Sequence, residues 1–492
     1  MPSKFSFKAH VKEYCSKCTF AGLHYIADET KHWIERFFWI VLVILSWYGS
    51  VLLIHAAWDA FVKSPISFGV ETTYLDWETN LPAVAICDNK AKANKYKIYN
   101  AAAKIWPSNY SYDLDDVLED IAYFRGQAYS LLKECLSENR NYLCPVSNYS
   151  YYASLIRSNC PQMLANCSYN NESFDCCEYF QLIETDIGHC FIINSIQTKK
   201  PRPYKMVNDI TNKRGVLRFK VFTASMLTFY IFKVYTLGVD EVPNIATLIS
   251  STLKIILGRM YRREITLKNI ENHPLVGETA LDKRACRFYH ENEDGLYPHY
   301  SYSACNVRCR KLAQLETCQC NDHFMPNTTD EERCNVTGMA CLHNHFAHLT
   351  TLKPKWAQRP GLSCDCLPSC NETEINIVQE VNQAIRPKVS KEAHVEIALS
   401  YLPTERFKRN VVRGRLDLVG KSQITALLEV SFSTTRWTRH LHVSVGGTAG
   451  LFVGASLLSF VELIFFFTVR LVNNIWMERR KQDNNVHRIK SF

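Results

Sequence analysis

Three glycines recur every four residues in an apolar stretch near the C-terminus, at Gly446, Gly450 and Gly454, with Gly447 beside the first. On a helix this spacing places them on one face. Glycine weakens a helix, so such a stripe needs a reason. One reason is close packing between membrane helices. The other is a narrow aqueous path at the axis of an oligomer, where carbonyl oxygens and the Ser456 hydroxyl replace the water shell of an ion.

An ionisable residue follows the glycines in the same stretch. Glu462 lies eight residues after Gly454, among leucine, isoleucine and phenylalanine. A carboxylate is costly in a membrane unless it faces water or a partner, so it is a functional candidate by default. The glycines and the glutamate together favour a pore.

Two apolar stretches could span a membrane and so position these groups. Phe37–Ala57 carries no formal charge in 21 residues, and a helix of that length covers about 31 Å, the thickness of a hydrocarbon core. A cleavable signal peptide is the competing interpretation, but 36 mostly polar residues precede the stretch. The second stretch, Val443–Val469, would form about 40 Å of straight helix and must tilt, break or protrude.

The segment between the two stretches has the marks of an extracellular domain. Seven Asn-x-Ser/Thr sequons occur there, and neither tail has one. The predicted glycosylation sites are Asn109, Asn148, Asn166, Asn171, Asn327, Asn335 and Asn371.

Eighteen of the 20 cysteines lie in the same segment, which permits up to nine disulfides in an oxidising compartment. Their pairing does not follow from the sequence. The candidates are Cys87, Cys135, Cys144, Cys160, Cys167, Cys176, Cys177, Cys190, Cys286, Cys305, Cys309, Cys318, Cys320, Cys334, Cys341, Cys364, Cys366 and Cys370.

The net charge of +9 is concentrated at the two ends of the chain. Residues 1–36 hold six Lys/Arg and four acids, and residues 470–492 hold six and two. A nucleic-acid groove would need the charge in a folded stripe, so we expect no nucleic-acid partner. By the positive-inside rule both short tails lie in the cytosol.

The extracellular segment reads as mixed α/β. Apolar residues at helical spacing predict a helix after Ser111, with Asp113 as a plausible N-cap. Alternating apolar residues from Val395 to Tyr401 predict a half-buried strand. The Cys305-x3-Cys309 and Cys318-x-Cys320 spacings predict a helical hairpin clamped by disulfides.

The C-terminal stretch, with its Gly-x-Ser sequence, resembles the second transmembrane segment of the degenerin/epithelial sodium channel superfamily. Further motifs match those of the family and occur in the same order along the chain. They resemble the motifs of the insect pickpocket branch. They are Tyr14-Cys15, LPAVAIC (Leu81–Cys87), GHCFIIN (Gly188–Asn194), RACRFYHE (Arg284–Glu291), a Tyr-Ser pair near Tyr300, and CDCLPSC (Cys364–Cys370).

The resemblance implies a homo- or heterotrimer of related subunits in the plasma membrane, with a hand-shaped ectodomain. It implies sodium-preferring, amiloride-blockable cation conduction gated by an extracellular stimulus, with sodium ions and membrane lipid as partners and no cofactor. The filter would be Gly454, Ala455 and Ser456, while Gly446, Gly447, Gly450 and Glu462 would line or pack the pore. Gating positions would be Ala21, Gly22, Val443 and Ser444.

Two of these positions depart from the family pattern. The cytosolic His-Gly motif of relatives reads Ala21-Gly22 here, and alanine neither hydrogen-bonds nor titrates as imidazole does. Val443 aligns with a position where many relatives carry a small side chain, and a bulky residue there can hinder closure in the family.

Residues 420–442 form a larger departure. Without them, Leu416–Val419 would join Val443–Gly447 as in relatives, so we interpret the segment as an in-frame insertion, real or arising from a retained intron in the gene model. Its Arg436, Arg439, His440 and His442 would place positive charge at the expected pore mouth.

Two metal-like patterns have ordinary explanations. Cys15-x2-Cys18 has no second pair nearby and is expected to be a pair of reduced thiols. Cys341 precedes three histidines but is expected in a disulfide, so we predict no metal site. The sequence has no Walker A or catalytic-triad signature, and we predict no enzymatic activity.

The predicted fold class is two transmembrane helices flanking a large disulfide-rich mixed α/β ectodomain. Its parts are a cytosolic tail (1–36), transmembrane helix 1 (37–57), an extracellular domain (58–442), transmembrane helix 2 with the pore (443–469), and a cytosolic tail (470–492). A non-conducting modulatory subunit and a two-pass scavenger or lipid receptor remain as alternatives. A receptor anchor would need neither the glycine stripe nor Glu462.

Overall fold

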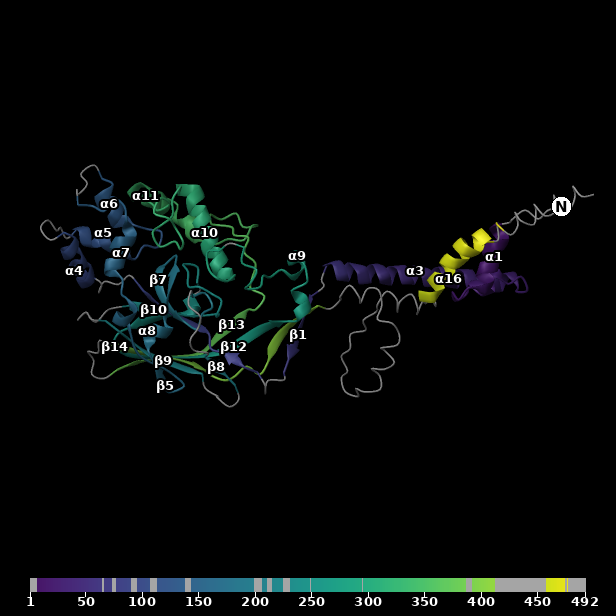
Figure 1. Cartoon of the computed structure of the whole chain (residues 1–492), viewed down its shortest axis with the longest axis horizontal. Helices are drawn as coiled ribbons and strands as arrows, with labels where there is room; N and C mark the ends of the chain where they lie inside the picture. Colours follow the sequence, from purple (N-terminus) through teal and green to yellow (C-terminus); the bar gives the residue numbers. More distant parts are fainter. Residues whose placement is uncertain are drawn as a thin grey trace, which may run out of the picture. The chain divides into compact units, whose positions relative to one another are not determined.

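A computed structural model describes residues 7–63, 66–72, 77–89, 95–106, 113–137, 143–198, 206–209, 215–223, 231–247, 249–293, 295–385, 392–411, 457–473 and 476. The chain divides into two compact units (Figure 1). One contains residues 1–67 together with 411–492, and the other contains residues 68–410. The predicted insertion at 420–442 lies outside the described residues.

The first unit is helical. It contains α1 (Phe7–Lys17), α2 (Leu23–Ala27), α3 (Trp33–Lys63), α16 (Leu457–Phe465) and a π-helical turn at Phe466–Arg470. In α3, the 21 residues Trp33–Leu53 are long and apolar enough to cross a membrane, and Ile44 and Leu45 are about 60% exposed. The helix begins four residues before the predicted Phe37 and continues past Ala57. Within the described residues it alone meets these criteria, because the second apolar stretch is described only from Leu457.

The larger sheet of the second unit follows the order β1–β15–β12–β14–β9–β4–β5, and β13 pairs with β12. β12 runs parallel to β14 and β15 and antiparallel to β13. The strands are β1 (Ile66–Glu71), β4 (Leu164–Tyr169), β5 (Glu172–Phe174), β9 (Val216–Phe222), β12 (Arg259–Asn272), β13 (Thr373–Ala384), β14 (Glu392–Leu399) and β15 (Arg406–Val411).

A smaller antiparallel sheet follows the order β11–β10–β3–β7–β6. Its strands are β3 (Ala83–Asp88), β6 (Gln181–Thr185), β7 (Gly188–Ile193), β10 (Ile231–Leu237) and β11 (Thr252–Ile256). Two short strands, β2 (Thr79–Asn80) and β8 (Val207–Asn208), pair separately. Every residue of β3 is buried, as expected for a central strand covered on both faces.

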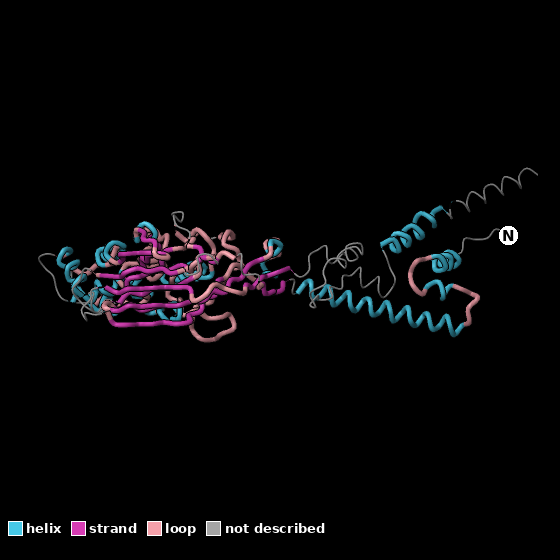
Figure 2. Tube along the Cα trace, turned by 90° about the horizontal axis from the view of Figure 1, so that it is seen from below, coloured by secondary structure: helices cyan, strands magenta, loops and turns pink. Residues whose placement is uncertain are grey.

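The alternation along β3 shows how the layers are stacked. Val84 and Ile86 belong to the core shared with the larger sheet, to which Phe219 of β9 also belongs. Ala83 and Ala85 point to the opposite face and join the core beneath a long helix, α10 (Tyr302–Cys318). The second unit is therefore built as sheet, sheet and helix, with the strands running side by side in Figure 2.

Helices gather at one end of this unit and above the smaller sheet (Figure 1). α5 (Asp113–Ala122), α6 (Tyr129–Cys135) and α7 (Tyr149–Ile156) share a core with α10, α11 (Val336–Asn344) and α12 (Phe346–Thr350). A second cluster joins α4 (Lys95–Ile105) to α5 and α7. The remaining helices are α8 (Cys176–Tyr179) and α9 (Leu281–Arg284).

All 18 cysteines of this unit are paired in nine disulfides: Cys87–Cys190, Cys135–Cys144, Cys160–Cys177, Cys167–Cys176, Cys286–Cys370, Cys305–Cys366, Cys309–Cys364, Cys318–Cys341 and Cys320–Cys334. Only one of these, Cys318–Cys341, joins α10 to α11. Cys305 and Cys309, one turn apart on α10, bond to the extended segment that ends at Cys370. The predicted clamp therefore holds a helix to an extended segment as well as to a second helix.

Two predicted elements differ slightly from those observed. α5 begins at Asp113, so the residue predicted as the N-cap is the first residue of the helix. β14 covers Val395 and Ile397 as predicted but ends at Leu399, and Tyr401 is 58% exposed beyond the strand.

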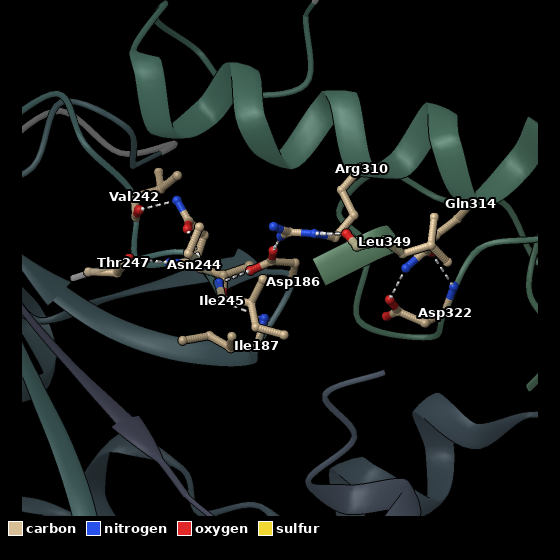
Figure 3. Close-up of polar contacts among 12 residues, drawn as sticks. Asp186, Ile187, Val242, Asn244, Ile245, Thr247, Arg310, Gln314, Asp322 and Leu349 are labelled. Carbon is tan, nitrogen blue, oxygen red and sulfur yellow. Dashed lines mark hydrogen bonds and ion pairs between the residues drawn. The ribbon is translucent and has the colours of Figure 1, made fainter. Parts of the chain in front are cut away.

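A buried polar joint connects the β6–β7 turn to α10 (Figure 3). Arg310 forms an ion pair with Asp186 and donates from Nε to the Leu349 carbonyl oxygen at 3.0 Å. The Arg310 and Asp186 side chains are 3% and 1% exposed. One turn along α10, Gln314 donates to Asp322 Oδ2 at 2.9 Å, and burial raises the pKa of Asp322. The smaller sheet and the helical layer are thus joined by polar groups that must remain partnered.

Removing one partner of this ion pair should destabilise the second unit. We expect Asp186→Ala to cost about 3–5 kcal/mol, because it leaves the Arg310 charge buried and unpaired. Thermal unfolding of the purified full-length chain should show a melting temperature lower by several degrees. Asp330→Ala is the matched control, since Asp330 is 92% exposed in its pair with Arg333. Equal melting temperatures for the two variants would contradict the structural role of the joint.

Candidate functional site

The described part of the predicted site centres on α16, which carries Glu462. Ala21 and Gly22 of the N-terminal segment are also described. The other predicted pore and gating residues lie outside the described residues: Val443, Ser444, Gly446, Gly447, Gly450, Gly454, Ala455 and Ser456.

A polar cluster holds the Glu462 carboxylate. Thr19 donates to Glu462 Oε2 from its backbone N at 3.3 Å and from its hydroxyl at 3.0 Å. The same hydroxyl lies 2.7 Å from the hydroxyl of Ser459, which is 1% exposed. Ser459 and Glu462 are three residues apart and so share a face of α16. The carboxylate is therefore stabilised by a residue 443 positions earlier in the chain.

An aromatic cluster lies one turn further along. The Tyr14 ring centre is 5.2 Å from that of Phe466 and 5.1 Å from that of Phe467, and His10 packs 4.8 Å from Phe466. Phe466 is 4% exposed. Burial raises the pKa of Tyr14 to about 12, so its hydroxyl remains protonated at physiological pH.

One further contact is made at the π-helical turn Phe466–Arg470. A π turn shifts the backbone hydrogen bonds by one residue, and such turns are frequent at functional sites. His10 Nε2 lies 3.2 Å from the Phe466 carbonyl oxygen and so acts as the donor to it. The side chain of α1 thereby partners a backbone group where the regular helix ends.

Two charged residues, Arg470 and Glu13, lie beside the aromatic cluster. Arg470 lies 4.6 Å over the Phe466 ring and forms an ion pair with Glu13 of α1. A hydrogen bond from Lys17, together with the Arg470 charge, holds the pKa of Glu13 below its usual range. Because Glu13 and Arg470 are each about one-third exposed, the pair adds orientation more than stability.

Gly22 fixes the path of the N-terminal segment against α3. Its φ is 87°, in the left-handed region, and a Cβ there would lie 2.7 Å from Val43 Cγ2. Tyr25 stacks on Trp39 of α3 at 4.4 Å. The segment therefore turns at Gly22 and contacts both α3 and α16. No imidazole is present at Ala21, but His24 Nδ1 lies 2.9 Å from the Ser16 carbonyl oxygen within the same segment.

The cysteines of this segment are thiols. Cys15 and Cys18 are half-buried and free, and burial raises the pKa of both. The thiolate, which binds metal and attacks disulfides, is therefore disfavoured. Elsewhere in the described residues, Cys318, Cys341 and His345 lie close together, but the two sulfurs are bonded to each other and cannot act as thiolate ligands.

The sequons of the second unit lie at its surface. The six described asparagines, Asn148, Asn166, Asn171, Asn327, Asn335 and Asn371, are all exposed, while Asn109 lies outside the described residues. Four of them have positive φ: Asn171 and Asn327 lie in turns, Asn148 is the N-cap of α7, and Asn166 lies at a register shift within β4.

Sequence reasoning identified Glu462 but not its partners. Neither Thr19 nor Ser459 belongs to a recognisable motif. Threonine and serine are common residues, so their presence at these positions gives no signal. Tyr14 entered the sequence argument only as part of a family motif. The Glu462 carboxylate in an apolar helix indicated that hydrogen-bond donors must lie nearby. It did not indicate which segment of the chain supplies them.

Three comparisons with known proteins bear on this arrangement. The sequence profile of a family described as "Amiloride-sensitive sodium channel" matches residues 14–466. Sodium channel protein Nach of Drosophila ananassae is 23% identical over 526 residues, covering 100% of this chain and 92% of that protein. Pickpocket protein 19 of Drosophila melanogaster is 23% identical over 488 residues, covering 90% and 87%.

Among solved structures, a chain described as a proton-activated chloride channel matches 80% of this chain and 90% of its own length. Its identity is 8% and its TM-score 0.24, too low for the likeness to bear on the fold.

The contact between Thr19 and Ser459 can be tested directly. In a Cys15→Ser, Cys18→Ser background, Thr19→Cys and Ser459→Cys should form a disulfide under mild oxidation, because the two hydroxyl oxygens lie 2.7 Å apart. Mass spectrometry of the digested chain should show the cross-linked peptide. Lys12→Cys with Ser459→Cys serves as the control, since Lys12 pairs instead with Glu29. Equal yields from both pairs, or none from either, would contradict the observed packing.

Proposed function

The chain belongs to the amiloride-sensitive sodium channel family, and on that premise we propose that it is a sodium-preferring, amiloride-sensitive channel subunit gated through its extracellular domain. Family membership makes it a cation channel subunit of the plasma membrane, in a family whose members assemble as trimers of related subunits. The family is one of ion channels rather than enzymes. The observation that carries the proposal is the match over residues 14–466, which includes the first apolar stretch, the whole second unit and all but the last three residues of the second stretch.

We assign ion selection to Gly454, Ala455 and Ser456, with Gly446, Gly447 and Gly450 on the same helix face. Three copies of that face around one axis would bring backbone carbonyls and Ser456 hydroxyls close enough to replace water around a sodium ion. Glu462 would then lie on the cytosolic side of the filter, where its charge favours cations.

The N-terminal segment supplies a basis for gating. Thr19 contacts Glu462, and Gly22 packs against Val43 of α3, so movement of α16 relative to α3 must carry or break these contacts. Ala21 and Gly22 are therefore assigned to gating from the cytosolic side, and Val443 and Ser444 to the extracellular end of the same helix.

A modulatory subunit that conducts only within heterotrimers is the second candidate. It is favoured by Ala21, which lacks the imidazole found in relatives, and by the cationic residues of 420–442 near the expected pore mouth. The receptor alternative accounts for two spans and a glycosylated ectodomain, but not for the family match.

Expression in oocytes separates these candidates. If the chain conducts alone, we expect an amiloride-sensitive sodium current when it is expressed by itself. If it is a modulatory subunit, we expect this current only when related subunits are expressed with it. Two-electrode voltage clamp measures the current in both cases. Surface biotinylation controls for delivery. Absence of current in every combination, despite surface delivery, would overturn the proposed function.

The filter assignment makes a separate prediction. Replacing Ser456 with the bulkier leucine should narrow the path and remove one hydroxyl per subunit, so the sodium-to-potassium permeability ratio should change severalfold or conduction should stop. Reversal potentials measure this ratio. Ser444→Leu is the control, because Ser444 lies outside the proposed filter. An unchanged ratio in a conducting Ser456→Leu channel would reject the assignment.

A further inference from the structure

The second unit contains a cavity of about 1150 Å³ beside the edge strand β6. Its volume is slightly above the range of about 300–1,000 Å³ that is usual for small-molecule sites. One wall is the outer face of β6, where Leu182 is 51% exposed. The facing walls come from α8, the loop that includes Tyr297, and the turn at Pro326–Asn327.

The walls are held in place by bonds independent of any ligand. The Cys160–Cys177 disulfide forms part of the wall beside α8. The Tyr297 hydroxyl donates to the Glu184 carbonyl oxygen at 2.9 Å, which fixes the loop to β6. Lys311 donates from Nζ to the Asn327 carbonyl oxygen at 2.6 Å. The cavity is therefore preformed, as binding sites for small ligands usually are.

Among the described lining residues of the cavity, the formal charges have one sign. Glu178 and Glu184 line it, and none of the described lining residues is lysine, arginine or histidine. The described residues form no ion pair with either carboxylate. The cross-strand neighbour of Glu184 is His189, whose pKa is lowered by burial, so it is neutral at pH 7 and supplies no counterion.

The remaining described lining contains both apolar and polar groups. Leu182, Leu296 and Pro298 offer hydrophobic surface, whereas Phe180 is buried in the core behind the wall. The Gln197 side chain donates to the Asp240 and His299 carbonyl oxygens at 2.6 and 3.0 Å, and so has little capacity left for a ligand. Two unpaired carboxylates on an apolar wall are complementary to a cation with a hydrophobic body.

We propose that this cavity binds an amphipathic organic cation, a small molecule with a protonated amine on an apolar body. The amine pairs with Glu178 and Glu184, and the body packs on Leu182 and Leu296. Binding is a property of the second unit alone. Its consequence, a change in channel current, rests on the proposed function.

Tryptamine is a suitable probe, with N-acetyltryptamine as a control that keeps the indole but removes the charge. We expect isothermal titration of the full-length chain in lipid nanodiscs to show saturable tryptamine binding, at least tenfold tighter than that of the acetylated compound. Empty nanodiscs provide the blank. Equal binding of the two compounds, or none of either, would overturn the proposal.

Matched variants locate the site. Glu178→Gln and Glu184→Gln preserve side-chain size and should each weaken tryptamine binding about tenfold. Glu331→Gln removes an exposed carboxylate outside the cavity and should leave affinity unchanged. If Glu331→Gln weakens binding as much as the cavity variants, the effect is general surface charge and the proposal fails.

The glycan predicted at Asn327 on the rim is the competing occupant. Thr329→Ala removes its sequon while keeping Asn327 and the Thr329 backbone N–H, which donates to Glu332. Equal tryptamine affinity with and without this substitution supports a cavity that the glycan does not occupy. Tryptamine binding seen only in Thr329→Ala would assign the cavity to the sugar and overturn the proposal. A binding-competent chain that passes no current in any subunit combination would refute the proposed function but not the site.

Discussion

A carboxylate within an apolar helix must find hydrogen-bond donors, and this constraint explains the arrangement of the first unit. Glu462 obtains its donors from the backbone and side chain of Thr19, far away in the sequence. Bringing Thr19 there requires the chain between α1 and α3 to reverse, and the left-handed Gly22 provides the turn. The aromatic contacts of Tyr14 and Phe466 follow from the same placement. The hydrogen bonds to Glu462 and the buried cluster of Tyr14, Phe20 and Phe466 thus together hold the N-terminal segment against the C-terminal helix.

The second unit is stabilised in a different way. Three of its nine disulfides begin on α10: two join it to the neighbouring extended segment and one joins it to α11. Between these covalent links, the Arg310–Asp186 pair joins the helical layer to the β6–β7 turn. The second unit is therefore cross-linked both covalently and electrostatically, whereas the described contacts of the first unit are hydrogen bonds, ion pairs and ring contacts, and its two cysteines are free.

Local patterns in the sequence predicted local structure well. The helical spacing around Val117 and the alternation around Val395 each gave an element that the structure contains, because burial on one face leaves a periodic trace. The family resemblance is confirmed by the match over residues 14–466. Disulfide pairing and the partners of Glu462 could not be derived, since both depend on which distant segments meet. Arg310 and Asp186 look like ordinary surface charges until the fold buries them together.

The connections between the two units limit how a signal can travel. The chain passes from one unit to the other only near residues 67 and 411, at the start of β1 and the end of β15. These strands are neighbours in the larger sheet, and Lys408 pairs with Glu71 across them at 2.8 Å. Arg409 lies 5.1 Å over the Phe68 ring and donates to the Cys370 carbonyl oxygen at 3.3 Å, next to the Cys286–Cys370 disulfide. A change in the disulfide-linked region can therefore reach the strand pair through Arg409. Coupling that passes along the chain from one unit to the other has to pass through these two strands, because the chain crosses between the units at no other point.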